Sequence, residues 1–296
     1  MHAKTTSCCC LLAILTLSGL HSTKGGDHIV EDYGKAPVVE DYGKAPIPAK
    51  GVYPKMPYED PIDYYAQANN PIAAVTAFSA ENYYISDFEG FSEDANQFLL
   101  RYATPLTLGG SDWLFRATLP INHFPVPAGG TETGLGDMGL GFTYLFETNE
   151  PNVSFGVGPT FRLPTATDSV LGNEKWSGGL NAVYFNGSNS KFQYGYEISW
   201  LQSFAGDDSR NYYSVGAFRP FAFYQLGNGW YTGTAPIWIY NFQNDNYNMP
   251  IGLRLGKVIE GPNKVVNFWV EPQVSMGNRG IMPDWQFWTG VKIQFW

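Results

Sequence analysis

From about residue 72 to the C-terminus, hydrophobic and polar side chains alternate along the chain. Between Phe287 and Phe295 every second residue is apolar or small, whereas the positions between them include Trp288 and Lys292. The segment from Val266 to Val274 repeats this pattern. A period of two predicts β-strands that have one apolar and one polar face.

This pattern predicts about twelve strands. Each spans about 10–14 residues, longer than the roughly 5–6 usual in globular sheets and close to the roughly 9–11 that a tilted strand needs to cross a bilayer. We expect the strands near residues 73–85, 96–105, 112–121, 135–147, 152–163, 175–186, 191–203, 213–226, 229–241, 248–258, 263–275 and 284–296.

The connections between these strands alternate between short turns and longer loops. Gly109–Ser111 and Gly227–Gly229 are examples of the turns. The longer loops fall at residues 122–133, 164–174, 204–212, 242–247 and 276–283. An even strand number with turns at one end and loops at the other is typical of outer-membrane barrels. A soluble β-sandwich also alternates, but its strands would be shorter and its polar face would carry more Lys and Glu.

The predicted fold is therefore all-β: a transmembrane antiparallel up-and-down β-barrel of about twelve strands, over residues 71–296, with an extended N-terminal periplasmic arm. Composition agrees, because only 15% of the residues are charged and 16% are aromatic, whereas soluble domains carry about 25% charge. The mean hydropathy of −0.20 excludes a helical membrane protein. Aromatic residues near the predicted strand ends suit the girdles at membrane interfaces: Trp113, Trp176, Trp230, Tyr231 and Trp285.

Residues 1–25 read as a signal peptide, with Lys4 before the uncharged run from Cys8 to Leu20. This segment contains all three cysteines and two of the 18 basic residues, so the mature chain would have 16 basic and 27 acidic residues, a net charge of −11. That sign argues against nucleic-acid binding. An exported chain without disulfides indicates a bacterial envelope protein, and the predicted barrel places it in the bacterial cell outer membrane.

Residues 26–70 form a proline-rich segment in which Val30–Pro37 recurs as Val39–Pro46. With mixed charges and no apolar period, it predicts a disordered arm. The arm could be a periplasmic linker, a plug of the barrel, or a binding site for a periplasmic partner with Tyr33 and Tyr42 as repeated contacts.

Five motifs occur in order along the predicted barrel: Gly134–Met138, Gly156–Thr167, Ser203–Asp207, Arg219–Phe221 and Pro283–Gln286. Together they resemble the outer-membrane proteins grouped as the "MetA-pathway of phenol degradation" family, over roughly residues 70–296. The resemblance implies an outer-membrane barrel that acts as a channel or transporter. The family name reflects an association with aromatic catabolism and establishes no substrate.

The chain departs from this family pattern at both ends. The N-terminal repeat is not part of the pattern, and the alternation places Phe295 on the lipid face and Trp296 on the other face. We therefore expect Phe295 to be the terminal aromatic that the barrel-assembly machinery recognises.

Charged residues on the polar faces of the strands are the candidate site. They would brace the barrel through interior salt bridges, or form a constriction that orients a polar or anionic head group. The candidates are Arg101, Arg116, Asp137, Arg162, Glu197, Arg219, Arg254, Glu271 and Lys292.

Signals for an enzyme or a cofactor are weak. The predicted mature chain has only His28, in the arm, and His123, in an expected loop, and it has no G-x-S-x-G motif and no metal-ligand spacing. Asp207-Asp208 and the segment Asn244–Asn246 fit solvated loops better than Ca²⁺ sites. We therefore expect no enzyme, no metal and no cofactor.

The predicted function is passive passage of small solutes, hydrophobic or aromatic ones among them, across the outer membrane. A barrel of about twelve strands has a narrow lumen, which loops or residues 26–70 would block. The alternative is a structural or binding barrel with an occluded lumen and a partner-binding arm.

Overall fold

A computed structural model describes residues 65–88, 93–126, 129–150, 152–261 and 263–295. The predicted signal peptide, most of the predicted arm and Trp296 lie outside these residues. A short helical turn at residues 65–67 comes before the first strand. All other regular structure among the described residues is β-strand.

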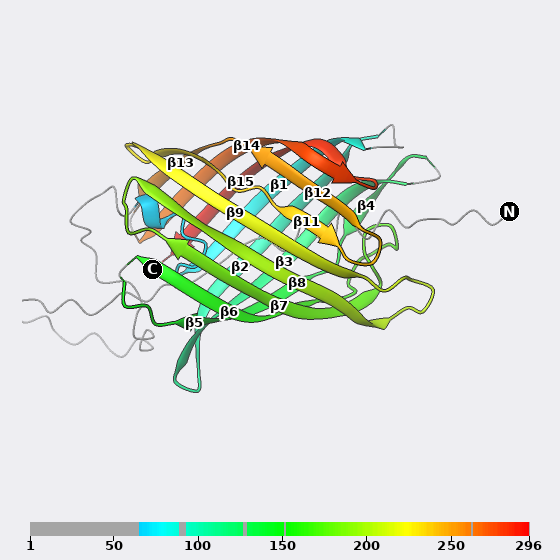
Figure 1. Ribbon diagram of the computed structural model, residues 1–296, viewed down its shortest axis with the longest axis horizontal. Coiled ribbons are helices and arrows are strands. Elements are labelled where there is room, and N and C mark those ends of the chain that lie inside the picture. Colours follow the sequence, from blue (N-terminus) through cyan, green and yellow to red (C-terminus); the bar gives the residue numbers. More distant parts are fainter. Residues whose placement is uncertain (1–64, 89–92, 127–128, 151, 262, 296) are drawn as a thin grey trace, which may run out of the picture.

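Fifteen strand segments form one antiparallel sheet (Figure 1). They are β1 Thr76–Phe88, β2 Ala95–Leu108, β3 Ser111–Pro125, β4 Thr131–Leu135, β5 Gly139–Phe146, β6 Val153–Arg162, β7 Lys175–Asn186, β8 Phe192–Gly206, β9 Ser214–Gly227, β10 Trp230–Thr234, β11 Trp238–Asn241, β12 Asn246–Gly252, β13 Arg254–Gly261, β14 Lys264–Arg279 and β15 Pro283–Phe295.

The sheet closes into a barrel because β1 pairs with β15, from Thr76 opposite Phe295 to Phe88 opposite Pro283. Three of the spanning strands are each interrupted once, which gives the pairs β4 and β5, β10 and β11, and β12 and β13. The fifteen segments therefore make twelve spanning strands. This confirms the predicted barrel and its twelve strands. Closure is required in a bilayer, because an open sheet edge in hydrocarbon would leave backbone groups without hydrogen-bond partners.

Two connections are much shorter than the sequence predicted. Residues 122–133 were expected to form a loop, but β3 runs to Pro125 and pairs with β4 in a hairpin. His123 therefore lies on a strand, where its Nδ1 is 2.6 Å from Thr133 Oγ1. Similarly, β14 continues to Arg279. In both places the alternation continues past the predicted boundary.

The outer surface of the barrel is apolar. Large hydrophobic side chains alternate along the outward face of nearly every strand; they include Phe78, Leu100, Phe161, Leu180, Ile198, Leu226, Leu255, Phe268, Val274 and Phe295. No helix among the described residues is long and apolar enough to span a bilayer. A closed sheet with an apolar outer belt has the architecture of a bacterial outer-membrane barrel.

Four of the five aromatic residues proposed for the girdles lie on this surface. Trp176, Trp230 and Trp285 are exposed, and Trp113 packs edge-to-face against Tyr144 on β5. The prediction for Tyr231 was wrong, because its ring is fully buried inside the barrel and its hydroxyl donates to Asn267 Oδ1 over 2.9 Å. Trp230 and Tyr231 are neighbours on a strand, so only one of them can face lipid.

The two ends of the barrel differ. One end carries the short turns and the Thr76 and Phe295 termini of the closing strands; we call it the turn end, and it faces the periplasm in barrels of this kind. The other end carries the β3–β4 hairpin and the longer connection at residues 163–174; we call it the loop end.

Candidate functional site

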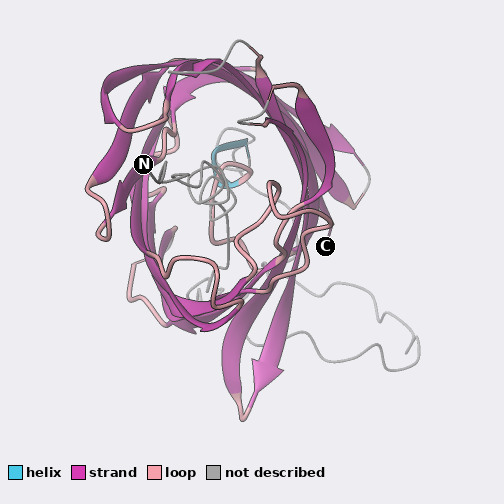
Figure 2. Ribbon diagram, turned by 90° about the vertical axis from the view of Figure 1, so that its right-hand side faces the viewer, coloured by secondary structure: helices cyan, strands magenta, loops and turns pink. Residues whose placement is uncertain are grey.

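Residues 65–75 lie inside the barrel at the turn end, where Figure 2 shows the short helical turn within the ring of strands. We call them the inner plug. Four hydrogen bonds join the plug to the wall. Gln67 Nε2 donates to Asn152 Oδ1 over 2.9 Å, and Asn70 Nδ2 donates to Ser154 Oγ on β6 over 3.4 Å. Lys292 Nζ donates to the carbonyl of Ala68 over 2.8 Å, and Asn267 Nδ2 on β14 donates to Asn69 Oδ1 over 2.8 Å.

The sequence of the plug explains its compact shape. Asn70 is fully buried, and its Oδ1 accepts the backbone N–H of Ile72 over 2.7 Å, which forms a turn of the kind that asparagine favours. Its Nδ2 donates to Gln67 Oε1 over 3.1 Å. Ile72 and Ala73 are completely buried next to this turn. The side chain of Asn70 thus fixes the turn of the plug, and buried apolar residues anchor it.

The middle of the lumen holds interior ion pairs. Arg254 Nε lies 2.6 Å from Glu271 Oε2, and Arg101 Nη1 lies 3.5 Å from Glu81 Oε1. Glu197 is shared, because Arg116 Nη2 lies 3.4 Å from one of its oxygens and Arg219 Nη1 lies 3.8 Å from the other. We call these residues and Lys292 the charged cluster: Glu81, Arg101, Arg116, Glu197, Arg219, Arg254, Glu271 and Lys292.

The charged cluster is net positive. It contains five cations and three carboxylates, an excess of two positive charges, inside a chain whose net charge is −9. In an interior of low dielectric constant this excess acts more strongly than charges at the surface do. The cluster therefore favours anions in the lumen.

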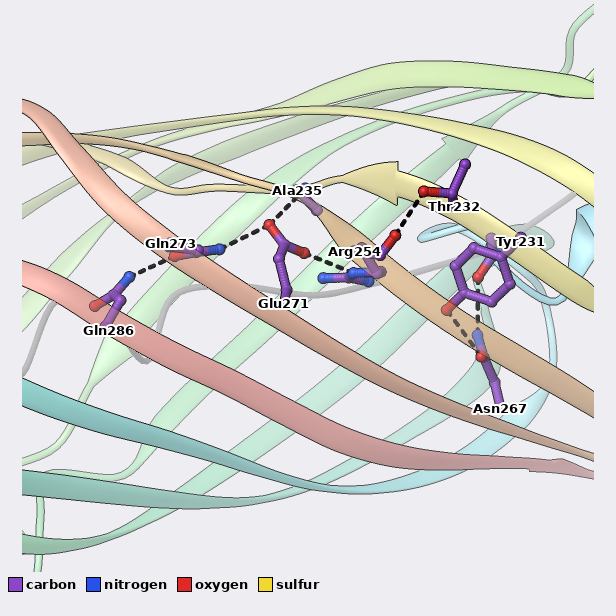
Figure 3. A network of polar contacts seen from close by, with 9 residues as sticks. Tyr231, Thr232, Ala235, Arg254, Asn267, Glu271, Gln273 and Gln286 are labelled. Atoms are coloured by element: carbon purple, nitrogen blue, oxygen red, sulfur yellow. Dashed lines mark hydrogen bonds and ion pairs between the residues drawn. The ribbon is translucent and has the colours of Figure 1, made fainter.

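Glu271 is the centre of a hydrogen-bond network (Figure 3). Besides Arg254, its carboxylate accepts the backbone N–H of Ala235 over 3.0 Å and Nε2 of Gln273 over 2.8 Å. Ala235 lies in the interruption between β10 and β11, so its N–H is free of the β-ladder and points to the carboxylate. The break in the strand thus frees a backbone N–H that, in an unbroken strand, would donate a hydrogen bond to the neighbouring strand.

Aromatic rings lie against the charged cluster. Trp288 stacks on Tyr83 with ring centroids 5.1 Å apart and meets Trp269 edge-to-face at 5.7 Å. The guanidinium carbons of Arg254 and Arg219 lie 4.3 and 4.9 Å from the centroid of the Trp288 ring. Such cation–π contacts stabilise the position of a cation in addition to its ion pair.

A glycine on the neighbouring strand makes space for one of these rings. A Cβ placed on Gly290 would lie 2.2 Å from the Trp269 ring. This approach requires glycine, because no larger residue leaves room for the indole.

At the loop end, residues 163–174 fold against the wall of the lumen. The Asp137 carboxylate accepts the backbone N–H groups of Ala166 over 3.2 Å and Asn173 over 2.7 Å. Asn122 Nδ2 donates to the carbonyl of Leu171 over 3.0 Å. Leu171 and Asn173 are buried. This connection, which we call the constricting loop, therefore narrows the loop end as the plug narrows the turn end.

The rim of the loop end also carries charge. Arg210 lies 3.0 Å from Glu174 and donates to the carbonyls of Ser169 and Gly172 over 2.7 and 2.6 Å. Hydrogen bonds from the side chain and the backbone N–H of Ser209 lower the pKa of the nearby Asp207 carboxyl. The described residues contain no group of three His, Cys, Asp or Glu side chains able to hold a metal.

The structure separates the nine candidate residues into two groups. Seven belong to the charged cluster: Arg101, Arg116, Glu197, Arg219, Arg254, Glu271 and Lys292. Asp137 and Arg162 lie apart from it, beside the constricting loop, and both are buried. Asp137 anchors a loop backbone rather than lining the middle of the lumen.

Sequence reasoning missed several residues of the lumen. Glu81 has the same period-two position as Tyr83 in its predicted strand and could have been found from that pattern. Lys175, which is fully buried with its Nζ 4.3 Å from the centroid of the Tyr212 ring, begins its strand. Trp269 and Trp288 lie on the polar face of their strands, but an apolar side chain gives no signal for a polar site.

A cavity of about 40 Å³ lies between the plug and the wall. Asn69 and Pro71 of the plug line it together with Arg101, Arg219, Arg254 and Trp288. A space of this size holds about three water molecules. The charged cluster and the plug thus meet at one narrow point of the lumen.

Comparison with known proteins agrees with this architecture. The family model described as "Putative MetA-pathway of phenol degradation" matches residues 89–203, which confirms the resemblance over that part of the chain. No curated protein sequence matches the chain.

Solved structures with a similar fold come from outer-membrane proteins. An outer membrane channel from Pseudomonas putida F1 aligns with a TM-score of 0.57 at 16% identity, over 76% of this chain and 96% of the channel. The NanC porin aligns at 0.46 and 10% identity, over 74% and 99%. Outer membrane phospholipase A from Escherichia coli aligns at 0.39 and 14% identity, over 79% and 96%.

Proposed function

We propose that the protein is a passive channel for small solutes in the bacterial outer membrane. The observation that carries this proposal is the lumen itself: an apolar barrel surface encloses a polar interior in which residues of the charged cluster line a small cavity beside the plug. Interior charge is costly to bury and is placed where ions or polar solutes pass. The similar fold of a protein described as an outer membrane channel supports the same function.

The inner plug limits what passes. It occupies part of the lumen at the turn end, and the cavity beside it has a volume of only about 40 Å³, so we expect larger solutes to need a shift of the plug. Besides its buried apolar residues, the plug has polar contacts with the wall from Gln67, Ala68, Asn69 and Asn70. We infer that these contacts set the conductance.

Our proposal includes hydrophobic and aromatic compounds among the solutes of this channel. Tyr83, Trp269 and Trp288 place aromatic rings next to the cations, buried beside the plug, so a solute would meet their apolar faces once the plug shifts. Such faces lower the cost of passing an apolar group through a polar lumen.

Single-channel recordings in planar bilayers test the channel. We would compare the full chain with the double variant Lys292→Met and Asn267→Ala, which removes two contacts to the plug. We expect measurable conductance in the full chain and at least a twofold increase in the variant. Arg279→Gln, at the exposed end of β14, is the control. Absence of conductance in every form would contradict the proposal.

A second candidate function is an occluded barrel whose N-terminal arm holds a periplasmic partner. The buried plug favours it, because it fills part of the lumen. Deletion of residues 26–60 distinguishes the two candidates. A structural or binding barrel would lose its partner in a pull-down and would not conduct with or without the deletion.

A further inference from the structure

Several buried donors that line the cavity beside the plug have no acceptor among the described residues, among them Arg254 Nη2, Trp269 Nε1 and Trp288 Nε1. The exposed fractions of Arg254, Trp269 and Trp288 are only 5%, 6% and 1%. A buried donor without an acceptor destabilises a protein, so three of them around one cavity indicate an occupant that accepts hydrogen bonds.

The charges around the cavity indicate that this occupant is an anion. Its described lining contains four cations, Arg101, Arg219, Arg254 and Lys292, but one carboxylate, Glu81. Glu197 and Glu271, which pair with Arg219 and Arg254, leave the whole cluster with two excess positive charges. A neutral acceptor would leave this excess uncompensated in a buried position.

The size and shape of the cavity select among anions. About 40 Å³ accommodates about three water molecules, which corresponds to the three heavy atoms of a carboxylate group. A tetrahedral oxyanion such as phosphate has five heavy atoms and needs more room than a carboxylate group. Guanidinium groups match the planar fork of a carboxylate, and two of them flank the Trp288 ring at 4.3 and 4.9 Å.

We propose that the cavity formed by Arg219, Arg254, Trp269 and Trp288 on the wall and by Asn69 of the plug is a binding site for the carboxylate group of a solute. The inference rests on the proposed channel and assigns it a class of solute, small monocarboxylates. Because the plug forms one side of the cavity, a bound carboxylate is held between the plug and the barrel wall.

Calorimetric titration of the full chain in neutral detergent, with sodium acetate as the probe, tests the site. We expect saturable binding of acetate and at least tenfold weaker binding of phosphate. Trp288→Phe removes one donor and keeps an aromatic ring, so it should weaken acetate binding severalfold. Arg219→Gln removes a charge and should weaken it about tenfold. The heat-modifiable mobility of each variant on a gel verifies folding.

Matched controls lie outside the lumen. Trp230→Phe, on the outer surface, and Arg279→Gln, at the end of β14, should bind acetate as the unchanged chain does. Equal binding by Trp288→Phe and the unchanged chain would overturn the assignment, as would phosphate binding as tight as acetate binding. If Arg219→Gln does not fold, acetate binding by Trp288→Phe still tests the carboxylate site.

The same preparations distinguish this inference from the channel itself. A protein that conducts in bilayers but shows no saturable acetate binding would overturn the carboxylate site alone. A protein that binds acetate with the expected response to Trp288→Phe but never conducts would overturn the channel and leave the site.

Discussion

Arg254 and Glu271 face each other across β13 and β14, next to the paired residues Leu255 and Val270, with Arg254 Nε 2.6 Å from Glu271 Oε2. Glu271 is completely buried. The pair joins two neighbouring strands from the inside of the barrel, and Ala235 from a third element donates to the same carboxylate.

Replacing Glu271 by alanine should therefore destabilise the barrel by about 3 kcal/mol, because it leaves the Arg254 charge buried and unpaired. The change can be measured by urea unfolding in detergent. The double variant Arg254→Met and Glu271→Met, which removes both charges, should recover at least half of the loss. If it unfolds as easily as Glu271→Ala, the ion pair does not explain the effect.

Asp137 should control the constricting loop rather than the selectivity of the lumen. Asp137→Ala removes the acceptor for the N–H groups of Ala166 and Asn173, which should expose residues 163–174 to proteases and leave ion selectivity unchanged. Limited proteolysis with mass spectrometry measures the first effect. Asp168→Ala, which removes only a local bond to Val170, is the control. Equal cleavage in both variants would contradict the assignment.

Gly290 should tolerate no side chain. Gly290→Ala places a Cβ 2.2 Å from the Trp269 ring and should lower stability by about 2 kcal/mol. Adding Trp269→Phe removes the ring atoms that clash and should restore part of this loss. Gly277→Ala has only an ordinary contact, 3.8 Å from Tyr247, and should be neutral. A neutral Gly290→Ala would show that the strands adjust more easily than the structure indicates.

The period of two predicted the fold because a lipid-facing strand must alternate, so strand number and the inward position of Arg116 or Glu197 follow directly from the sequence. Which inward charges lie together does not follow from it. Asp137 and Arg219 have equivalent positions on their faces, yet one anchors a loop and the other belongs to the charged cluster. The residues that surround Asp137 and Arg219 are determined by barrel closure and by the folding of the loops, which bring together residues far apart in the chain.

The inner plug also could not be assigned from the pattern. Residues 65–75 have no apolar period, and proline and asparagine in them suit a linker as well as a plug. Their place is set by side chains on distant strands, such as the bond from Asn267 Nδ2 to Asn69 Oδ1 over 2.8 Å.

The reversal potential of single channels in a KCl gradient tests the central claim that the charged lumen is the path of solutes. The excess positive charge of the cluster predicts a preference for chloride, although the chain as a whole has a net charge of −9. Arg116→Gln should reduce this preference because Glu197 remains paired only with Arg219, whereas the exposed Arg279→Gln should leave it unchanged. A preference for potassium in the unchanged chain, or the same potential in Arg116→Gln, would contradict the account.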